Sequence, residues 1–236
     1  KFNTGMNRYG FNANQIESII SKLKNNPHLK LMSICSHLAA SDDKNKTDFT
    51  LRQIKNFKLL SKKFTLTLGK NIDKHVLNSH GVLNFPNYQM EAVRLGIGLY
   101  GSTTEVNLKP ISSLISVIAQ TRSLKKGECL GYGTTFIAKE KMEIGIIPVG
   151  YADGINRQFS NNTGSVFINN CTCPIVGKIS MDSFAIDITK CNVQERDVVE
   201  IFGENLTVSK ISKKIHTIPY EIYSTLNKRI KRVYCD

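Results

Sequence analysis

The stretch NQIESIISKLKNNPHLKLMSICSH, residues 14–37, decides how the first part of the chain folds. Four apolar side chains in it recur at helical spacing: Ile16, Ile19, Ile20 and Leu23. Asn12 stands upstream, where an asparagine can cap a helix, and Pro27 ends the helical pattern. The run LKLMSICSH, residues 29–37, is short and apolar. We therefore predict a helix over residues 14–24 and a strand over residues 29–37.

The alternation of helix and strand continues as far as Tyr100. A second helix is predicted from about Asp48 to Ser61, and further strands at residues 64–68 and 92–100. Strands separated by helices form right-handed βαβ units with a parallel sheet. In a (β/α)₈ barrel the site lies where the strands end. Polar side chains fall at or just after the predicted strand ends: Arg8, His37, Ser79 and Arg94.

The pattern changes after about Pro110. Short β-rich runs such as MEIGIIPVGY, CPIVGKIS and DVVEIFG follow, separated by turns rich in Gly, Asn and Asp. Helical periodicity is scarce until residues 208–215. The sequence therefore predicts part of an α/β barrel over residues 1–110, followed by a mostly antiparallel β domain over residues 111–236.

The formal net charge of +13 makes a nucleic-acid-binding protein the main alternative of another class. The lysines, however, are spread along nearly the whole chain, and aromatic residues do not alternate with them as in proteins that stack bases. We expect no nucleic-acid partner. No run of about eighteen apolar residues occurs, so we expect no membrane span. Residues 1–10 lack the apolar stretch of a signal peptide, and a cytoplasmic location is expected.

The six cysteines follow no zinc-binding pattern, because Cys171 and Cys173 are separated by one residue instead of two to four. A chain of this size and apolar content does not need disulfides to fold. We expect reduced thiols and no metal site.

Five segments, in this order, resemble the signature segments of alanine racemases. They are KFNTGMNRYGF (1–11), VRLGIGLYG (93–101), VGYADGINR (149–157), GKISMDSFAID (177–187) and TIPYE (217–221). The resemblance covers both predicted domains. It implies the C-terminal half of a (β/α)₈ barrel of the fold-type-III class, followed by the family's β domain. It also implies pyridoxal 5′-phosphate as cofactor, interconversion of L- and D-alanine for peptidoglycan, and a homodimer with shared active sites.

Racemisation requires two acid–base groups on opposite faces of the substrate. In the family one is the cofactor lysine, and the other is a tyrosine supplied by the partner subunit, which matches Tyr151. A phenol, whose pKa is about 10, is a weak base at neutral pH, so nearby cations must favour its ionised form. By the resemblance, His37 contacts this tyrosine and Arg94 contacts His37.

The resemblance also assigns cofactor-binding residues. Arg94 matches the arginine that bonds the pyridine nitrogen, and an arginine donates without accepting a proton. The phosphate would bind the Ser79 hydroxyl and the backbone N–H groups around Gly96 and Ile97. Arg8 matches the arginine near the cofactor's phenolic oxygen.

The substrate carboxylate would meet Arg8 and, across the subunit interface, the backbone N–H of Met181. Asp182 lies next to that N–H and is expected at the same site. Lys1 matches a lysine that many members carry as a carbamate, which holds the arginine that Arg8 matches.

Three positions depart from the family pattern: Asn3 replaces an aspartate, Leu95 a proline, and Lys228 a tyrosine that some members place beside the catalytic one. The cofactor lysine would lie upstream of Lys1, so we expect a fragment that is inactive alone. A racemase of another amino acid, such as serine, and a non-catalytic interaction module are the remaining alternatives.

Overall fold

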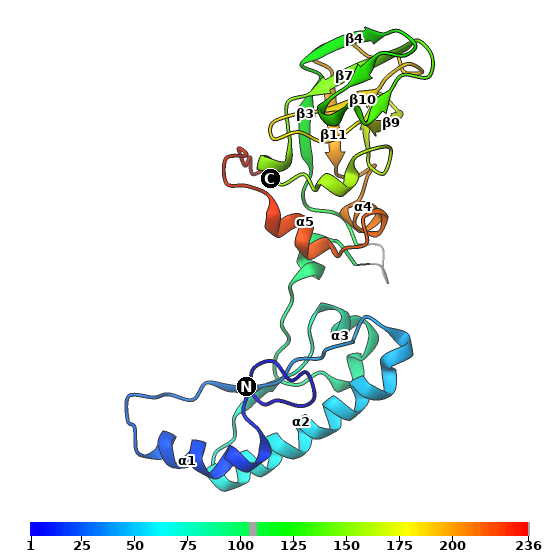
Figure 1. The fold of residues 1–236 in the computed structure, drawn as a ribbon. Helices are drawn as coiled ribbons and strands as arrows, with labels where there is room; N and C mark the ends of the chain where they lie inside the picture. The colour runs from blue at the N-terminus through cyan, green and yellow to red at the C-terminus, as the bar shows by residue number, and fades with distance from the viewer. Residues whose placement is uncertain (104–107, 236) are drawn as a thin grey trace. The chain divides into compact units, whose positions relative to one another are not determined.

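The computed structural model describes residues 1–103 and 108–235. The chain divides into two compact units. We call Lys1–Leu99 the barrel unit, and residues 100–103 and 108–235 the β unit. The barrel unit is blue to green-cyan in Figure 1 and the β unit green to red.

The barrel unit is built on two short parallel strands, β1 (Ser33–Cys35) and β2 (Asp73–His75), paired so that Cys35 lies opposite His75. The long helix α2 (Thr47–Leu68) connects them. A 3₁₀ turn (Ala13–Gln15) leads into α1 (Ile16–Lys24), as predicted, and α3 (Ser79–Asn84) follows β2. Shorter 3₁₀ turns span Lys44–Lys46, Pro86–Tyr88 and Ile97–Tyr100. The core residues include Ile16, Ile20, Ile34, Ile54, Phe57, Phe64 and Leu77.

Two predicted strands of this unit are wrong. Residues 64–68 form the end of α2, because Phe64 lies two turns after Phe57 and buries its ring on the same side of the helix. The helix ends only at Gly69, whose φ of 72° gives the left-handed cap that glycine tolerates. Residues 92–100 contain no strand and run as a loop into a 3₁₀ turn.

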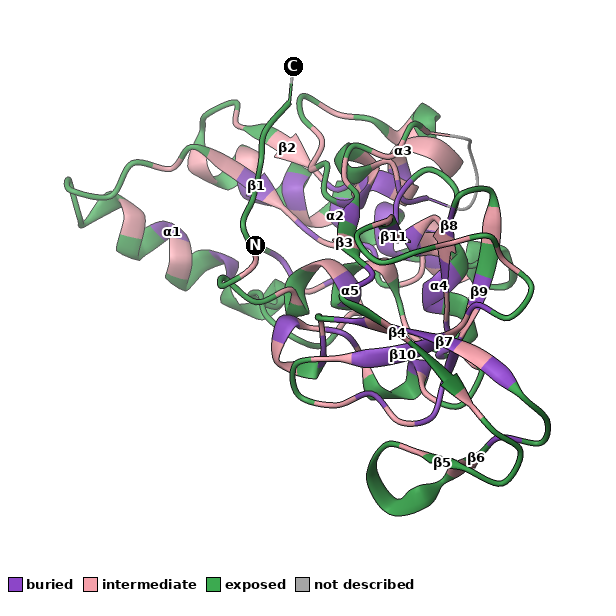
Figure 2. Ribbon diagram, turned by 90° about the horizontal axis from the view of Figure 1, so that it is seen from above, coloured by how far each residue is buried: buried purple, intermediate pink, exposed green. Residues whose placement is uncertain are grey.

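The β unit contains a seven-stranded sheet in the order β3-β11-β8-β9-β10-β7-β4. Every pairing within it is antiparallel, as predicted. The strands are β3 (Leu114–Val117), β4 (Gln120–Leu124), β7 (Met142–Ile147), β8 (Ser165–Ile168), β9 (Cys171–Val176), β10 (Phe184–Asp187) and β11 (Val198–Phe202). A separate hairpin of β5 (Cys129–Leu130) and β6 (Phe136–Ile137) is largely exposed (Figure 2).

Two helices complete the β unit: α4 (Val208–Lys214), at the predicted position, and α5 (Pro219–Thr225), which the sequence analysis missed. Short 3₁₀ turns lie at Tyr132–Thr134, Tyr151–Asp153 and Arg157–Phe159. The core between sheet and helices is rich in isoleucine and includes Ile147, Ile168, Ile186, Ile201, Ile211 and Ile222. In the described part of the chain, no helix is long and apolar enough to cross a membrane.

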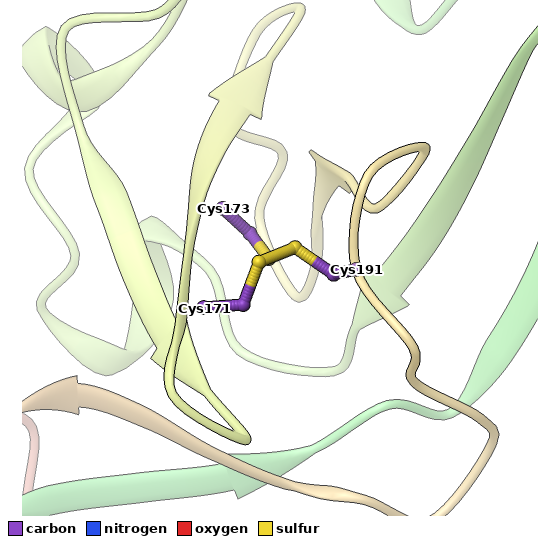
Figure 3. A group of neighbouring side chains, drawn as sticks. All are labelled: Cys171, Cys173 and Cys191. Atoms are coloured by element: carbon purple, nitrogen blue, oxygen red, sulfur yellow. A yellow bond between two sulfur atoms is a disulfide. The ribbon is translucent and has the colours of Figure 1, made fainter.

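Three cysteines meet in the β unit, and two of them are not the reduced thiols that we expected. Cys171 and Cys191 form a disulfide, and the Cys173 sulfur lies 3.4 Å from that of Cys191 (Figure 3). Cys171 and Cys173 stand two apart on β9 and therefore face the same side of the sheet. The turn after β10 brings Cys191 to them, and this tertiary contact cannot be read from spacing. Burial raises the pKa of the Cys173 thiol to about 11.

Candidate active site

Arg94 binds the carboxyl ends of both strands of the barrel unit. Its Nη2 donates to the carbonyl of Ser36, just after β1, at 2.5 Å, and its Nη1 to the carbonyl of His75, the last residue of β2, at 3.1 Å. Its backbone N–H donates to the carbonyl of Leu77 at 2.9 Å. The guanidinium is therefore fixed at the strand ends, although residues 92–100 form no strand.

Two histidines contact the Arg94 guanidinium. His37 Nδ1 lies 3.2 Å from Nη2, which is the contact expected between these two residues. His75 Nδ1 contacts Nη1, and His75 Nε2 lies 3.1 Å from Ser33 Oγ. His75 was not singled out from the sequence, because the strand was predicted at residues 64–68 and not at Asp73–His75.

The cations around His37 set its protonation state. Burial, then the charges of Arg94, Lys1 and Arg8, lower the pKa of His37. Burial, Arg94 and the N-terminal ammonium lower the pKa of His75. Both imidazoles are therefore neutral at neutral pH, and each Nδ1 accepts from the arginine. The proton of each ring must then be on Nε2, so His37 has an N–H to donate to another group.

Ser79 joins the loops expected to bind a phosphate. It is the first residue of α3 and is buried, and its Oγ accepts from the backbone N–H of Gly96 at 2.9 Å and of Gly98 at 3.1 Å. With both lone pairs used, its O–H remains to donate to an anion. A Cβ at Gly98 would lie 3.3 Å from this Oγ, so a side chain there would crowd the group. Ile97 is buried between the two glycines.

The tyrosine and methionine expected at the site lie on two adjoining loops of the β unit. We call residues 150–154 the Tyr151 loop and residues 180–183 the Met181 loop. The Tyr151 N–H donates to the Ser180 carbonyl, and the Ala152 N–H to the Met181 carbonyl, both at 3.0 Å. The Tyr151 side chain is 42% exposed and Met181 is 54% exposed. Both residues are therefore open to solvent on the surface of the β unit.

Arg229 bonds both of these loops and was not singled out from the sequence. Its Nε and Nη2 donate to the two carboxylate oxygens of Asp153 at 2.6 and 2.9 Å, and Nη2 also donates to Asp182 at 2.7 Å. The bond from Arg229 is the main reason that the pKa of Asp153 is lowered, and a backbone bond from Gly150 adds to it. Asp182, expected at the site, is thus held by an arginine 47 residues away in sequence.

The Arg157 guanidinium lies 5.8 Å from the centre of the Tyr151 ring, in the range of a cation–π contact. This places a cation beside the phenol within the β unit itself. The expected contact between Tyr151 and His37 would join the two units and stays a prediction.

An apolar hollow of about 360 Å³ lies elsewhere in the barrel unit, between α1 and the strands. Its walls are mainly hydrophobic side chains such as Leu23, Leu31 and Ile34, and Lys1 is the predicted site residue among them. Of the polar groups described above, Ser33 lines the hollow, whereas Arg94, the two histidines and Ser79 do not. We therefore place the candidate site at the strand ends.

Comparison with known proteins gives a consistent result for both units. The family profile described as "Alanine racemase, N-terminal domain" matches residues 1–104, and "Alanine racemase, C-terminal domain" matches residues 111–234. An alanine racemase of Rickettsia bellii is 38% identical over 99% of this chain. The crystal structure of biosynthetic alanine racemase from Pseudomonas aeruginosa matches with a TM-score of 0.88, at 31% identity over the whole chain. That of alanine racemase from Bartonella henselae with covalently bound pyridoxal phosphate matches with a TM-score of 0.85, at 31% identity over 98% of it.

The chain spans 57% of the length of the Rickettsia bellii relative. It covers 66% of the Pseudomonas aeruginosa chain and 64% of the Bartonella henselae chain.

Proposed function

The chain belongs to the alanine racemase family, and on that premise we propose that the whole protein interconverts L- and D-alanine with pyridoxal phosphate as cofactor. Its fold is part of a (β/α)₈ barrel followed by the family's β domain. The observation that carries the proposal is the arrangement at the strand ends, where one guanidinium, Arg94, is bonded to both strands and to two histidines.

The residues of the barrel unit fit this cofactor. The Ser79 O–H would donate to the phosphate, together with the backbone N–H of Ile97. The Gly96 N–H, also expected to bind it, donates to Ser79 Oγ instead. Arg94 would donate to the pyridine nitrogen, and Arg8 would meet the phenolic oxygen and the substrate carboxylate. When bound, the cofactor withdraws electrons from the α-carbon of the amino acid and makes its proton acidic.

The β unit would supply the second acid–base group. In the proposal the Tyr151 oxygen takes the α-proton on one face or returns it there. The Nε2–H of His37 would donate to this oxygen, and the Arg157 guanidinium lies beside the ring. The backbone N–H of Met181 holds the substrate carboxylate, and Asp182 fixes the loop beside it. Lys1, where carbamylated, would hold Arg8 in place.

We also propose that the protein is a homodimer whose sites are shared, with Tyr151 and Met181 reaching the barrel unit of the partner subunit. The exposure of these two side chains supports this assignment. Cytoplasmic location stays a prediction, and the Cys171–Cys191 disulfide is a feature rare in cytosolic proteins.

Tyr151→Phe in the full-length protein tests the assignment of the base. The change removes one proton-transfer group, and such groups contribute about 10²- to 10⁴-fold to rate. We expect kcat to fall by that order while the cofactor absorbance stays. The assay follows D-alanine formed from L-alanine with D-amino-acid oxidase, and L-serine is run in parallel. Loss of the cofactor absorbance in Tyr151→Phe would contradict the role of Tyr151 as the base. Faster turnover of serine than of alanine by the wild type would show that serine is the substrate.

Mixing two inactive variants tests the shared site. In a dimer with shared sites, a subunit carrying Arg94→Gln and one carrying Tyr151→Phe together form one intact site. Random pairing then restores about one quarter of the wild-type activity, because half of the dimers are mixed and one of their two sites is intact. No recovery on co-expression, with mixed dimers shown by mass, would place both residues in the same subunit.

A further inference from the structure

We propose that Arg229 is a positioning residue that fixes the distance between the Tyr151 loop and the Met181 loop. The inference builds on the proposed function, in which the first loop moves the proton and the second holds the substrate carboxylate. Arg229 lies outside the motifs that resemble the family's signature segments.

The backbones of the two loops already touch. Two N–H groups of the Tyr151 loop donate to carbonyls of the Met181 loop at 3.0 Å. A Cβ on Gly150 would lie 2.2 Å from the Met181 carbonyl oxygen, so the backbones of the two loops are in close contact. These contacts fix the line along which the loops meet. They do not involve the side chains of Asp153 and Asp182.

Arg229 connects those two carboxylates. Two donors of its planar guanidinium, Nε and Nη2, bond the two carboxylate oxygens of Asp153, which is 8% exposed. The same Nη2 also bonds Asp182. Asp153 is held further by the Gly150 N–H at 2.8 Å, and its carbonyl accepts from Asn227 at 3.0 Å. A lysine could not make these bonds together, because it presents a point charge without the fork.

The segment that carries Arg229 is itself tied to the Tyr151 loop. Gly154, with a φ of 105°, lies so close to the end of α5 that a Cβ there would be 2.4 Å from the Thr225 carbonyl oxygen. Arg232 then bonds the carbonyls of Leu226, Asn227 and Ile230. The Arg229 guanidinium therefore extends from a segment that is held by several hydrogen bonds. Its bonds to Asp153 and Asp182 can restrict the movement of both loops.

The first test measures hydrogen exchange at the backbone amides of Tyr151 and Ala152, which donate to the Met181 loop. We expect Arg229→Gln to speed their exchange at least about tenfold, because the loops can separate locally. Lys231→Gln, which removes one charge from an exposed neighbour, is the matched control and should leave both amides unchanged. Unchanged exchange in Arg229→Gln would overturn the proposal.

The second test measures kcat and KM for alanine in the full-length holoenzyme. We expect Arg229→Gln to lower kcat about 100-fold, the cost of a misplacement of about 1 Å, while cofactor absorbance stays. Arg229→Lys should recover part of the loss by pairing with one carboxylate. A variant that loses only thermal stability, with unaltered kcat, would reduce Arg229 to a structural residue and overturn the proposal.

The two tests separate the two hypotheses. If the wild-type holoenzyme does not racemise alanine, the proposed function fails. Amide exchange still decides whether Arg229 fixes the distance between the two loops. If the wild type racemises alanine and Arg229→Gln does so equally fast, the positioning role of Arg229 is refuted and the proposed function remains.

Discussion

At the scale of single residues, Arg94 organises the polar groups of the barrel unit. It is half-buried, and its Nη1 and Nη2 groups bond carbonyls and the two imidazoles, while its Nε–H makes no such bond within the described part of the chain. Burial, and then the charge of Arg94, lower the pKa of both neighbouring histidines and keep them neutral. His37 and His75 are therefore ready to accept from Arg94 and to donate through Nε2.

This arrangement predicts how stability changes with pH. The pKa values of His37 and His75 are lowered in the folded state from an ordinary value of 6.5. Below pH 6.5 the unfolded chain therefore binds more protons than the folded one. The stability of the barrel unit is full above that pH and is lost as pH falls through the lowered values.

Urea unfolding followed by circular dichroism at about pH 7.5 and about pH 5.5 checks this. We expect His37→Gln and His75→Gln each to reduce the loss of stability on acidification. Each change removes one imidazole that binds a proton more readily in the unfolded chain than in the folded one. His28→Gln, on an exposed turn, is the control. Equal losses in all the proteins would refute the assignment.

At the scale of elements, the loops that follow strands carry the site, and their close packing restricts their sequence. Gly150 follows β7 and faces the Met181 carbonyl, which is backbone and cannot rotate away. Gly145, within β7, meets only side-chain carbons, at 3.3 Å or more. The two glycines thus differ in what a methyl group would encounter, although neither has a positive φ.

We predict that Gly150→Ala destabilises the β unit by about 1–3 kcal/mol, the usual cost of forcing atoms into a packed site. Gly145→Ala should cost less, because flexible side chains can move aside. Thermal melting of both variants measures the difference. A cost for Gly145→Ala as large as that for Gly150→Ala would show that close approach to backbone is not the reason.

At the scale of the whole molecule, the two compact units have separate cores. The Cys171–Cys191 disulfide lies wholly within the β unit and closes a separation of 20 residues. A crosslink of that length stabilises by about 3 kcal/mol, mainly by restricting the unfolded chain. Its effect should therefore be confined to one unit.

We predict that Cys191→Ser lowers the unfolding midpoint of the β unit and leaves that of the barrel unit unchanged. Calorimetry under non-reducing conditions measures both transitions, and Cys129→Ser, an exposed free cysteine, serves as control. Equal shifts of both transitions would show that the units unfold together. No shift in either would show that the crosslink does not contribute.

Local sequence pattern was sufficient to predict the helix over residues 14–24, the start of α2 and the antiparallel character of the β unit, because each depends on a local period of apolar residues. It also determined the family, through motifs that are contiguous in the chain. The strands predicted at residues 64–68 and 92–100 were wrong. A short apolar run has the same local pattern in a strand, at a buried helix end and in a loop.

Which side chains meet depends on the tertiary structure. Arg94 with His75, Arg229 with Asp153 and Asp182, and Cys171 with Cys191 are each separated by 19 or more residues. None of these pairs follows from spacing, because contacts across a sheet or between loops depend on how the chain returns. The chemistry of the residue types was thus readable from sequence, whereas their partners were fixed by the fold.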